Sequence, residues 1–485
     1  MCLLLHKQLL VPLIIILWFC SDSCSISSQE HLLNNILDEN NQAYPTYLRY
    51  IADHAPSLIE YEPEIYGAEE FDQADSPQPS PAAVSVEDFG AKGDGVTDDT
   101  EAFEEAWKEV CSSDGSVLVI PEEKSFFLRP IIFKGPCKSE LTVQIYGTLQ
   151  ASDNRKDYKK DRRHWLLFEK IDNLTVEGGG TIDGKGEIWW NNSCKINKTL
   201  PCTHAPTAIT FYECNDLKVR NIRIKNSQQM HLAFQKCVDV QATSLMVTAP
   251  GKSPNTDGIH VTNTQNIQIM NCVIRTGDDC ISIVDGAENV QATDITCGPG
   301  HGISIGSLGA DKSEDHVTDV TVDRARLVGT TNGVRIKTWQ VTIRPNLLTF
   351  CNIGEFFYAS ICVFSNMQGG KGNATNIVFQ NIFMQNVTNP IIIDQNYCDQ
   401  KGPCKQQKSA VQVKNVVYRN IKGTSASKVA IKFDCSENHP CESILLQDVE
   451  LEGEEEEDDE KTDKVTALCR NVKWSRHGTV RPACP

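Results

Sequence analysis

The feature that most constrains the fold is a loose repeat of short segments that runs from residue 173 almost to the end of the chain. In each segment apolar and polar residues alternate, most segments open on Asn or Asp, and most neighbours begin 23 to 30 residues apart. Alternation with period two predicts strands, and short strands repeated at this distance indicate a solenoid. The segments are NLTVEGG (from residue 173), DLKVRNIRI (216), DVQATSLMV (239), NIQIMNCVI (266), NVQATDITC (289), DVTVDRARL (319), NIVFQNIFM (376), NVVYRNIKG (415) and SILLQDVEL (443).

The pattern of these segments favours one kind of solenoid. A helical solenoid needs apolar residues at a period of 3.6, which the segments lack. A β-sandwich, the second choice, leaves the recurring Asn and Asp unexplained. We therefore predict an all-β chain that forms a right-handed parallel β-helix, with a stacked ladder of side-chain amides in its turns. Residues 84–111 read as a short strand, a Gly-rich loop and an amphipathic helix, so a short helix should cap the N-terminal end.

Composition divides the chain into three parts. Residues 1–25 have a basic start, an apolar run from Leu9 to Cys20 and small residues after it. This is typical of a secretory signal peptide, and the run is too short to span a membrane easily. Residues 26–82 are polar and acidic and end in SPQPSPAA, as expected of a loosely ordered extension or propeptide. Residues 83–485 remain for the β-helix, so we expect a secreted, extracellular protein without membrane contact after cleavage.

Cysteine content and glycosylation sequons agree with secretion. Twenty cysteines fit an oxidising compartment, and none has the paired CxxC spacing of a zinc site. Short separations between cysteines predict local disulfides, and the sequons predict a glycoprotein. The predicted disulfides are Cys398/Cys404, Cys435/Cys441, Cys469/Cys484 and Cys280/Cys297, and the sequons begin at Asn173, Asn191, Asn197, Asn373 and Asn386.

The net charge of −18 is concentrated in two segments. Residues 26–80 carry −10 and residues 450–463 carry −9, so the rest of the chain is close to neutral. Acidic runs of this kind usually remain solvated, and the basic footprint of a nucleic-acid-binding protein is absent. The near-neutral body can therefore still bind an anionic substrate through a local basic site.

Four segments can be aligned on their first inward-facing apolar residue. They are TDGIHV (256–261), DDCISI (278–283), GHGISI (300–305) and TNGVRI (331–336). Two positions before that residue stand Asp257, Asp279, His301 and Asn332. Neighbouring coils of a β-helix are separated by one inter-strand spacing, about 4.8 Å. Asp257, Asp279 and His301 should therefore stack in a column across three coils.

Further charged residues join this column. Asp278 lies beside it, one residue before Asp279, where Gly277 lets the chain bend. One coil further, Arg335 and Lys337 alternate with apolar residues, so both cations should face solvent on one side of the strand. Carboxylates this close repel each other, so at least one should have a raised pKa and hold a proton. Hydrolysis of a glycosidic bond requires one protonated and one ionised carboxyl, and the cations would hold an acidic sugar.

Four motifs in this order carry a resemblance to a known family. The motifs NTDGIH (255–260), TGDDCISI (276–283), GPGHGISIG (298–306) and RIK (335–337) resemble those of the polygalacturonases, pectin-degrading β-helix glycoside hydrolases. The similarity covers about residues 84–485 apart from a stretch after Gln340, and the chain looks most like secreted plant members. The resemblance implies hydrolysis of α-1,4-linked galacturonan with inversion, in the cell wall, by a monomer that needs no metal or other cofactor.

The resemblance also assigns roles to the clustered residues. Asp278 would be the general acid that protonates the leaving oxygen, and Asp257 and Asp279 would together orient and deprotonate the attacking water. His301 would tune the acid and help to position it. An inverting enzyme needs room for a water, so the acid and base carboxyls should be about 6.5–9.5 Å apart.

The remaining residues that the resemblance assigns would contact the substrate. Arg335 and Lys337 would bind the carboxylates of galacturonate. Asn255, the first residue of NTDGIH, and Tyr397, in IIIDQNYC, match substrate-contacting positions of the family. The resemblance also implies that the disulfide between Cys280 and Cys297 bridges the coils on either side of the site.

Other functions stay open at this point. The same fold could hydrolyse a substituted pectin such as xylogalacturonan or rhamnogalacturonan, although the pair Arg335 and Lys337 favours unsubstituted galacturonate. A second alternative is a catalytically silent pectin-binding protein, which the presence of all three Asp residues does not support. A lyase would need Ca²⁺ held by carboxylates and an Arg base, and no such cluster stands out. Endo and exo action are both compatible with the sequence.

The family pattern breaks after Gln340, where residues 341–368 separate RIKTWQ from GGKGNATNIVFQNI. This segment of 28 residues is apolar, contains two cysteines and lacks the Asn or Asp signal of the coils. The step from Asp319 to Asn376 is 57 residues, and without the segment it would be 29, so the register of the coils is kept. A retained intron explains the segment best, because its end codons can carry the GT and AG of an intron. A lid over the site is the alternative.

Overall fold

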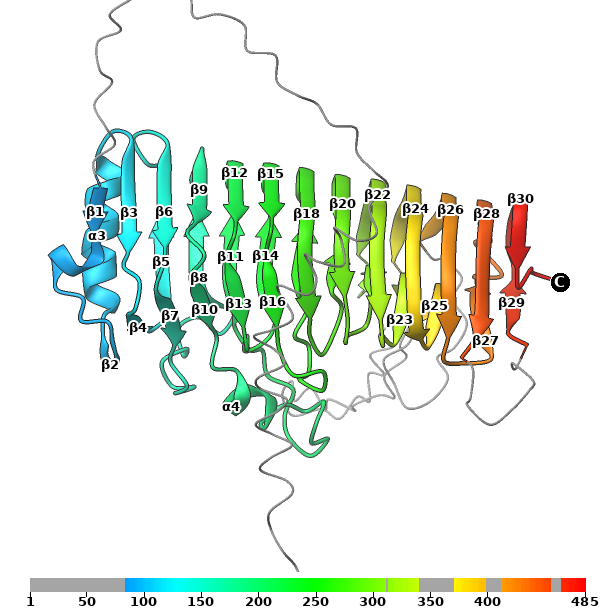
Figure 1. Ribbon diagram of the computed structural model, residues 1–485, viewed down its shortest axis with the longest axis horizontal. Coiled ribbons are helices and arrows are strands. Elements are labelled where there is room, and N and C mark those ends of the chain that lie inside the picture. The colour runs from blue at the N-terminus through cyan, green and yellow to red at the C-terminus, as the bar shows by residue number, and fades with distance from the viewer. Residues whose placement is uncertain (1–82, 311–312, 340–369, 398–410, 455–463) are drawn as a thin grey trace, which may run out of the picture. The chain divides into compact units, whose positions relative to one another are not determined.

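The computed structural model describes residues 83–310, 313–339, 370–397, 411–454 and 464–485. The chain splits into a unit Met1–Gln78, which lies outside these residues, and a unit Pro79–Pro485. In the described part of the second unit nearly all regular structure is β-strand (Figure 1). None of the helices in the described ranges is long and apolar enough to cross a membrane. The predicted signal peptide and propeptide lie in the part that is not described.

Among the described residues the strands form two parallel sheets, and three helices accompany them. The helices are η1 Val86–Phe89, α3 Thr100–Ser112 and α4 Glu187–Trp190. The first sheet contains β1 Ala83–Ser85, β2 Asp94–Asp98, β3 Ser116–Ile120, β4 Ser125–Leu128, β6 Leu141–Ile145, β7 Thr148–Ala151, β9 Leu174–Glu177, β10 Thr181–Asp183, β12 Asn215–Arg220, β13 Arg223–Lys225, β15 Val238–Thr243, β16 Met246–Thr248, β18 Gln265–Arg275, β20 Glu288–Cys297, β22 Glu314–Val328, β24 Lys371–Val387, β26 Gln412–Ser425, β28 Cys441–Gly453 and β30 Val472–Arg481. The second sheet contains β5 Ile131–Lys134, β8 His164–Glu169, β11 Thr207–Tyr212, β14 Leu232–Gln235, β17 Ile259–Thr262, β19 Ile281–Ile283, β21 Ile303–Leu308, β23 Asn332–Trp339, β25 Asn389–Tyr397, β27 Val429–Asp434 and β29 Thr466–Arg470.

Each turn of chain contributes one strand to the second sheet and two strand segments to the first. In the early coils the two segments are separate strands, such as β15 and β16, and both pair in parallel with the single bent strand β18. The pairing then continues from β18 to β20 and from β20 to β22, one coil at a time (Figure 1). The chain is thus the predicted right-handed parallel β-helix, and all nine repeat segments lie in its first sheet.

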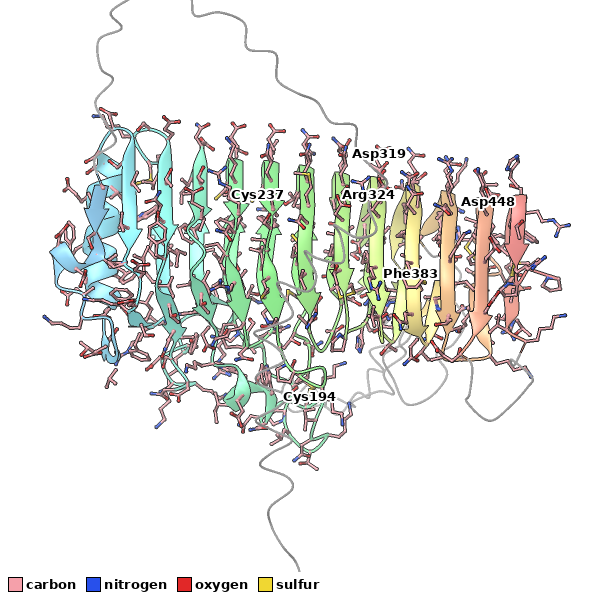
Figure 2. The ribbon with its side chains drawn as sticks, viewed as in Figure 1. Cys194, Cys237, Asp319, Arg324, Phe383 and Asp448 are labelled. Carbon is pink, nitrogen blue, oxygen red and sulfur yellow. A yellow bond between two sulfur atoms is a disulfide. The ribbon has the colours of Figure 1, made fainter. Side chains whose placement is uncertain are left out.

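The recurring Asn and Asp form the predicted ladder on the first sheet. These residues adopt left-handed backbone angles, for example φ 57° at Asp239 and 56° at Asn266. Asn and Asp tolerate this region better than other non-Gly residues, which explains why the repeat selects them. Asn266 donates to Asp239 over 2.9 Å and Asn289 donates to Asn266 over 2.9 Å, so each side chain stacks on the coil before it. The same ladder continues at Asp319, which Figure 2 shows on β22.

The core is a set of apolar stacks enclosed by the coils. Ile259, Ile281, Ile303 and Val334 are each 0% exposed and are paired neighbours in the second sheet. The helix α3 covers the N-terminal end of these stacks, where Trp107 packs edge-on against Phe133 at 5.1 Å between ring centroids. The predicted N-terminal helix cap is therefore confirmed.

Disulfide bonds cross-link the chain at several places among the described residues. Three predicted pairs are present, Cys280–Cys297, Cys435–Cys441 and Cys469–Cys484, while the predicted pair Cys398/Cys404 lies outside the described residues. Two further disulfides, Cys111–Cys137 and Cys194–Cys202, have separations of 26 and 8 residues and were not predicted. The second of these closes the loop after α4, which Figure 2 shows among the loops that project beyond the strands.

The apolar segment 341–368 also lies outside the described residues, but both of its flanks are described. On the first sheet Glu314 pairs with Lys371, and on the second sheet Arg335 pairs with Ile392. Asn376 donates to Asp319 across the 57-residue step, so the ladder passes the segment without a break. The predicted register of the coils on either side is confirmed.

Deleting residues 341–368 should therefore give a chain that folds at least as well as the parent. The reason is that the pairs on both sheets are already in register without the segment, and a shorter connection costs less closure entropy. The thermal unfolding midpoint of the two forms, followed by circular dichroism, checks this expectation. Loss of cooperative unfolding in the shorter form would show that the segment is an integral part of the fold.

Candidate active site

The four segments that align in the sequence also align in the structure. Their first inward apolar residues are paired neighbours in β17, β19, β21 and β23. Asp257, Asp279 and His301 each stand two positions before such a residue, and therefore occupy equivalent places in three successive coils. Asn332 occupies the same place in the next coil and donates to the main-chain oxygen of His301 over 3.2 Å. The predicted column is present.

Asp278 lies beside this column because of a close main-chain approach. A Cβ atom at Gly277 would lie 2.0 Å from the main-chain oxygen of Ser253, so only glycine fits immediately before Asp278. The Asp278 Oδ1 atom lies 2.9 Å from Nδ1 of His301, and Asn255 donates to its Oδ2 over 3.5 Å. The side chain of Asp278 is 19% exposed, so this carboxyl can be reached by a substrate.

Asp279 is instead buried in a network of donors. Its side chain is 2% exposed and accepts from Arg335 Nη2 over 2.7 Å and from Lys337 Nζ over 3.0 Å. Ser304 Oγ donates to the same carboxylate over 2.8 Å. Two ion pairs and a hydroxyl hold Asp279 in one orientation, and hydrogen bonds between charged groups of this kind are short and strong.

The prediction that Arg335 and Lys337 face solvent is wrong. Both side chains lie on the outer side of β23, as the alternation requires, but they are only 13% and 11% exposed. The cause is Asp279, two coils earlier, whose carboxylate draws both cations against the sheet. Lys337 also lies over the ring of Tyr397 at 5.5 Å, so the predicted Tyr397 does belong to this cluster.

Three residues of the site were missed in the sequence. Ser282 Oγ donates to Asp257 Oδ2 over 2.9 Å, and His260 Nδ1 lies 2.7 Å from the same hydroxyl. His260, Ser282 and Ser304 are paired neighbours between buried apolar residues, in the column that continues to Arg335 in the next coil. The alternation that placed Arg335 could have found them, because each of these side chains points outward from its strand. Each carboxylate of the main column is thus held by a serine from the next coil.

Burial and neighbouring charges shift the pKa values of Asp257 and Asp278 in opposite directions. Burial, together with repulsion by Asp278 and Asp279, raises the pKa of Asp257 well above its usual value. Burial also works to raise the pKa of Asp278, but the hydrogen bond and charge of His301 and the charges of Lys337 and Arg335 outweigh it and lower the pKa. The expectation of one raised pKa is confirmed, and the carboxyl concerned is Asp257. Burial lowers the pKa of His260 to about 4, so this ring is neutral.

The same groups bear on metal binding. One donor atom each from Asp278, Asp279 and His301 lies within 4.8 Å of the others, close enough to share an ion. However, Arg335 and Lys337 already bind the carboxylate of Asp279, and two fixed cations repel a third. This donor set therefore suits an anionic or polar ligand better than a metal ion. The closeness of Asp278 and Asp279 also leaves little room for a water between them.

Replacing Asp257 with Asn should stabilise the fold at neutral pH. Because the pKa of Asp257 is raised on folding, the folded state holds a proton that the unfolded state releases above about pH 4, and stability falls as pH rises. Asn removes this penalty, so the unfolding midpoint should rise by about 1–3 °C at pH 7 and by nothing below pH 3. Scanning calorimetry across pH measures the difference, with Asp239→Asn in the ladder as a matched control. A gain that persists at pH 3 would contradict a raised pKa.

Comparison with known proteins bears on this site. The model of a family described as Glycosyl hydrolases family 28 matches residues 111–354 and 363–479. A polygalacturonase from Persea americana is 54% identical over 452 residues, which cover 92% of this chain and 91% of the relative. A polygalacturonase from Malus domestica is 50% identical over 500 residues, which cover 99% of this chain and 100% of the relative.

Solved structures with the same fold are more distant in sequence. An exopolygalacturonase from Thermotoga maritima has a TM-score of 0.63 at 22% identity, covering 83% of this chain and 92% of the other. An endo-xylogalacturonan hydrolase from Aspergillus tubingensis has a TM-score of 0.63 at 20% identity, covering 82% and 100%. At these identities the likeness supports the β-helix fold and nothing further.

Proposed function

The chain belongs to family 28 of the glycosyl hydrolases and acts as a polygalacturonase; from this premise we propose that it cleaves the α-1,4-galacturonosyl linkages of pectin with inversion at the anomeric carbon. The single observation that carries the proposal is that three neighbouring carboxyls differ in burial, in charge partners and in pKa. Asp279 is buried and paired with Arg335 and Lys337, Asp257 has a raised pKa, and Asp278 is accessible to a ligand. Such a group of unlike carboxyls supplies both an acid and a base for glycosidic hydrolysis.

The proposed reaction moves one proton through this group. Asp278 gives its proton to the glycosidic oxygen as the bond from that oxygen to the anomeric carbon breaks. A water attacks the opposite face of the carbon and gives its proton to the pair Asp257 and Asp279, so charge and atoms balance. His301, 2.9 Å from Asp278, orients the acid and exchanges the proton with solvent between turnovers. Asp279 is too close to Asp278 and too fully bonded to act alone, so Asp257 accepts the proton.

The substrate's own charge explains how Asp278 becomes protonated. In the free protein the positive charges of Lys337 and Arg335 help to lower the pKa of Asp278. Both cations keep donors that Asp279 does not use, since Arg has five N–H groups and Lys has three. A galacturonate carboxylate bound there neutralises them and raises the pKa of Asp278, which draws the proton from Asp257 to the acid. Binding of an anionic sugar therefore favours the form of the site in which Asp278 is protonated and can act as the acid.

The pH dependence of hydrolysis should be bell-shaped and should differ between free and bound protein. At low pH the proton-accepting pair Asp257 and Asp279 is protonated, and at high pH the three carboxyls lose their last proton. The rate of hydrolysis therefore falls at both ends of the pH range. Because the bound carboxylate raises the pKa of Asp278, the alkaline limb of kcat should lie at higher pH than that of kcat/KM. Initial rates from pH 3 to 8 measure both profiles. Coincident alkaline limbs would contradict the effect of the substrate's charge, and a flat profile would contradict the paired carboxyls.

The substrate assignment is tested by comparing three polymers. Polygalacturonate, its fully methyl-esterified form and xylogalacturonan are incubated with the protein, and new reducing ends and product sizes are followed over time. The proposal expects rapid cleavage of polygalacturonate and poor cleavage of the other two, because the cations bind a free carboxylate. Equal cleavage of esterified and free polymer would show that the cations do not recognise the carboxylate.

We also propose that the protein is secreted and acts in the cell wall. The support is the signal-like residues 1–25, the oxidised cysteine pairs of the described residues, and the location of pectin. Expression of the full chain in plant cells, followed by assay of the wall fraction and the cytosol, checks this. Activity confined to the cytosol would contradict it.

A further inference from the structure

A hollow of about 460 Å³ lies beside the site and takes no part in the chemistry described above. It is formed by α4, by the loop that the disulfide Cys194–Cys202 closes, and by the turn that carries Asn255. Figure 2 shows Cys194 in the group of loops that projects beyond the strands. The loop carries none of the repeat pattern, so its form is not dictated by the coils.

The charge of this hollow is positive. Its lining includes Arg155, Lys195 and Lys198 and contains neither Asp nor Glu. Outside its two acidic segments the chain is close to neutral, so three cations gathered on one lining without a carboxylate are a local excess of positive charge. A hollow of this charge attracts an anionic ligand.

Aromatic and uncompensated polar groups complete the lining. Trp190 is held in place by a hydrogen bond from its Nε1 to the main-chain oxygen of Ser227 over 3.0 Å, and Arg155 lies over the ring of Trp189 at 5.1 Å. Gln228 is 1% exposed, and its Oε1 has no hydrogen-bond partner among the described residues. The indole N–H of Trp189 is likewise buried without a partner there. An unused acceptor and an unused donor beside aromatic rings suit the hydroxyls and apolar face of a sugar.

The hollow is continuous with the active site through Asn255. This residue lines the hollow and also donates to Asp278 over 3.5 Å. We propose that the hollow is an additional subsite, adjacent to the active site, that binds galacturonate units of the polymer which carry free carboxylates; this rests on the proposed function. Arg155, Lys195 and Lys198 bind the carboxylates, while Trp190 and Gln228 contact the sugar ring. The subsite gives the protein a preference for long unesterified runs over short oligomers.

The test uses two exposed lysines of the hollow and a matched control. The double variant Lys195→Gln/Lys198→Gln removes two cations and keeps the Asn197 sequon intact, and Lys159→Gln/Lys160→Gln removes two exposed cations that do not line the hollow. The measured quantity is the ratio of kcat/KM on polygalacturonate to kcat/KM on the shortest oligogalacturonate that the parent cleaves. In the first variant this ratio should fall about tenfold, as loss of charge-assisted contacts predicts. In the control it should stay at the parent value.

Salt and oligomer length provide independent readings. Raising ionic strength should lower the ratio for the parent and change it little for the hollow variant. With oligomers of increasing length, parent and variant should diverge only once a chain reaches the hollow. A ratio unchanged by Lys195→Gln/Lys198→Gln, or lowered equally by the control, would overturn the subsite. If the parent cleaves neither polymer nor oligomer, the proposed function itself fails, so the two failures are distinguishable.

Discussion

Replacing Asp278 with Asn should lower kcat on polygalacturonate by about 10²–10⁴-fold, the usual cost of removing a general acid. Asn has the same shape and retains its neighbours Asn255 and His301, but it has no proton to give to the leaving oxygen. Binding of oligogalacturonate should therefore persist, so the loss should fall on kcat and not on KM. Initial rates and the affinity for an oligomer, measured on the purified variant, separate the two effects.

The matched control for this variant is Asp239→Asn. Asp239 belongs to the ladder of the first sheet, accepts from Asn266, and has Asn at the equivalent place in the next coil. The control makes the same chemical change far from the site and should keep parental kcat. Near-normal turnover in Asp278→Asn would remove this residue from the role of acid. A loss that Asp239→Asn shares would indicate a general effect on the fold.

Replacing Lys337 with Met should damage both stability and activity. The change leaves the buried carboxylate of Asp279 with only Arg335 and Ser304 as charged or hydroxyl partners. Breaking a buried pair from one side costs about 3–5 kcal/mol, and the remaining Arg335 places this case near the lower end. Loss of the substrate contact and of the charge that tunes Asp278 should lower kcat/KM by about 10²-fold, the effect of roughly 3 kcal/mol. Urea unfolding and initial rates measure the two losses.

A triple variant separates the structural role of Lys337 from the functional one. Adding Asp279→Asn and Arg335→Met to Lys337→Met removes all three charges of the cluster, so no buried charge is left without a partner, and most of the stability should return while activity stays low. Lys422→Met is the control, because Lys422 forms an exposed pair with Glu450 at 3.4 Å. An exposed pair of this kind contributes about 0–1 kcal/mol. Recovery of activity in the triple variant would contradict substrate contacts by Lys337 and Arg335.

The fold and the main column were predictable from the sequence for a physical reason. Alternation with period two fixes which side chains leave a strand on the same face, and a near-constant coil length brings Asp257, Asp279 and His301 into register. The left-handed conformation of residues such as Asn266 explains why the same residue types return at each coil. The alternation and the recurring Asn and Asp can both be recognised in short stretches of sequence, so neither requires knowledge of the three-dimensional structure.

The features that could not be predicted from the sequence depend on contacts between residues that are far apart in the chain. Arg335 and Lys337 pair with Asp279 across 56 and 58 residues, so their burial could not be inferred from strand alternation alone. The raised pKa of Asp257 depends on burial and on three other charged groups. The hollow beside α4 is built by a loop without periodicity, and the disulfide Cys194–Cys202 that closes it has no counterpart in the repeat.

The most direct test of the account is the configuration of the product at the moment it forms. A proton NMR spectrum is recorded within the first minutes of hydrolysis of an oligogalacturonate, before the new reducing ends mutarotate. Inversion of an α-linkage by Asp278 and the pair Asp257 and Asp279 predicts that the β-anomer appears first and the α-anomer grows in later. First appearance of the α-anomer would mean a retaining reaction through a covalent intermediate, which would contradict the proposed roles of all three carboxyls.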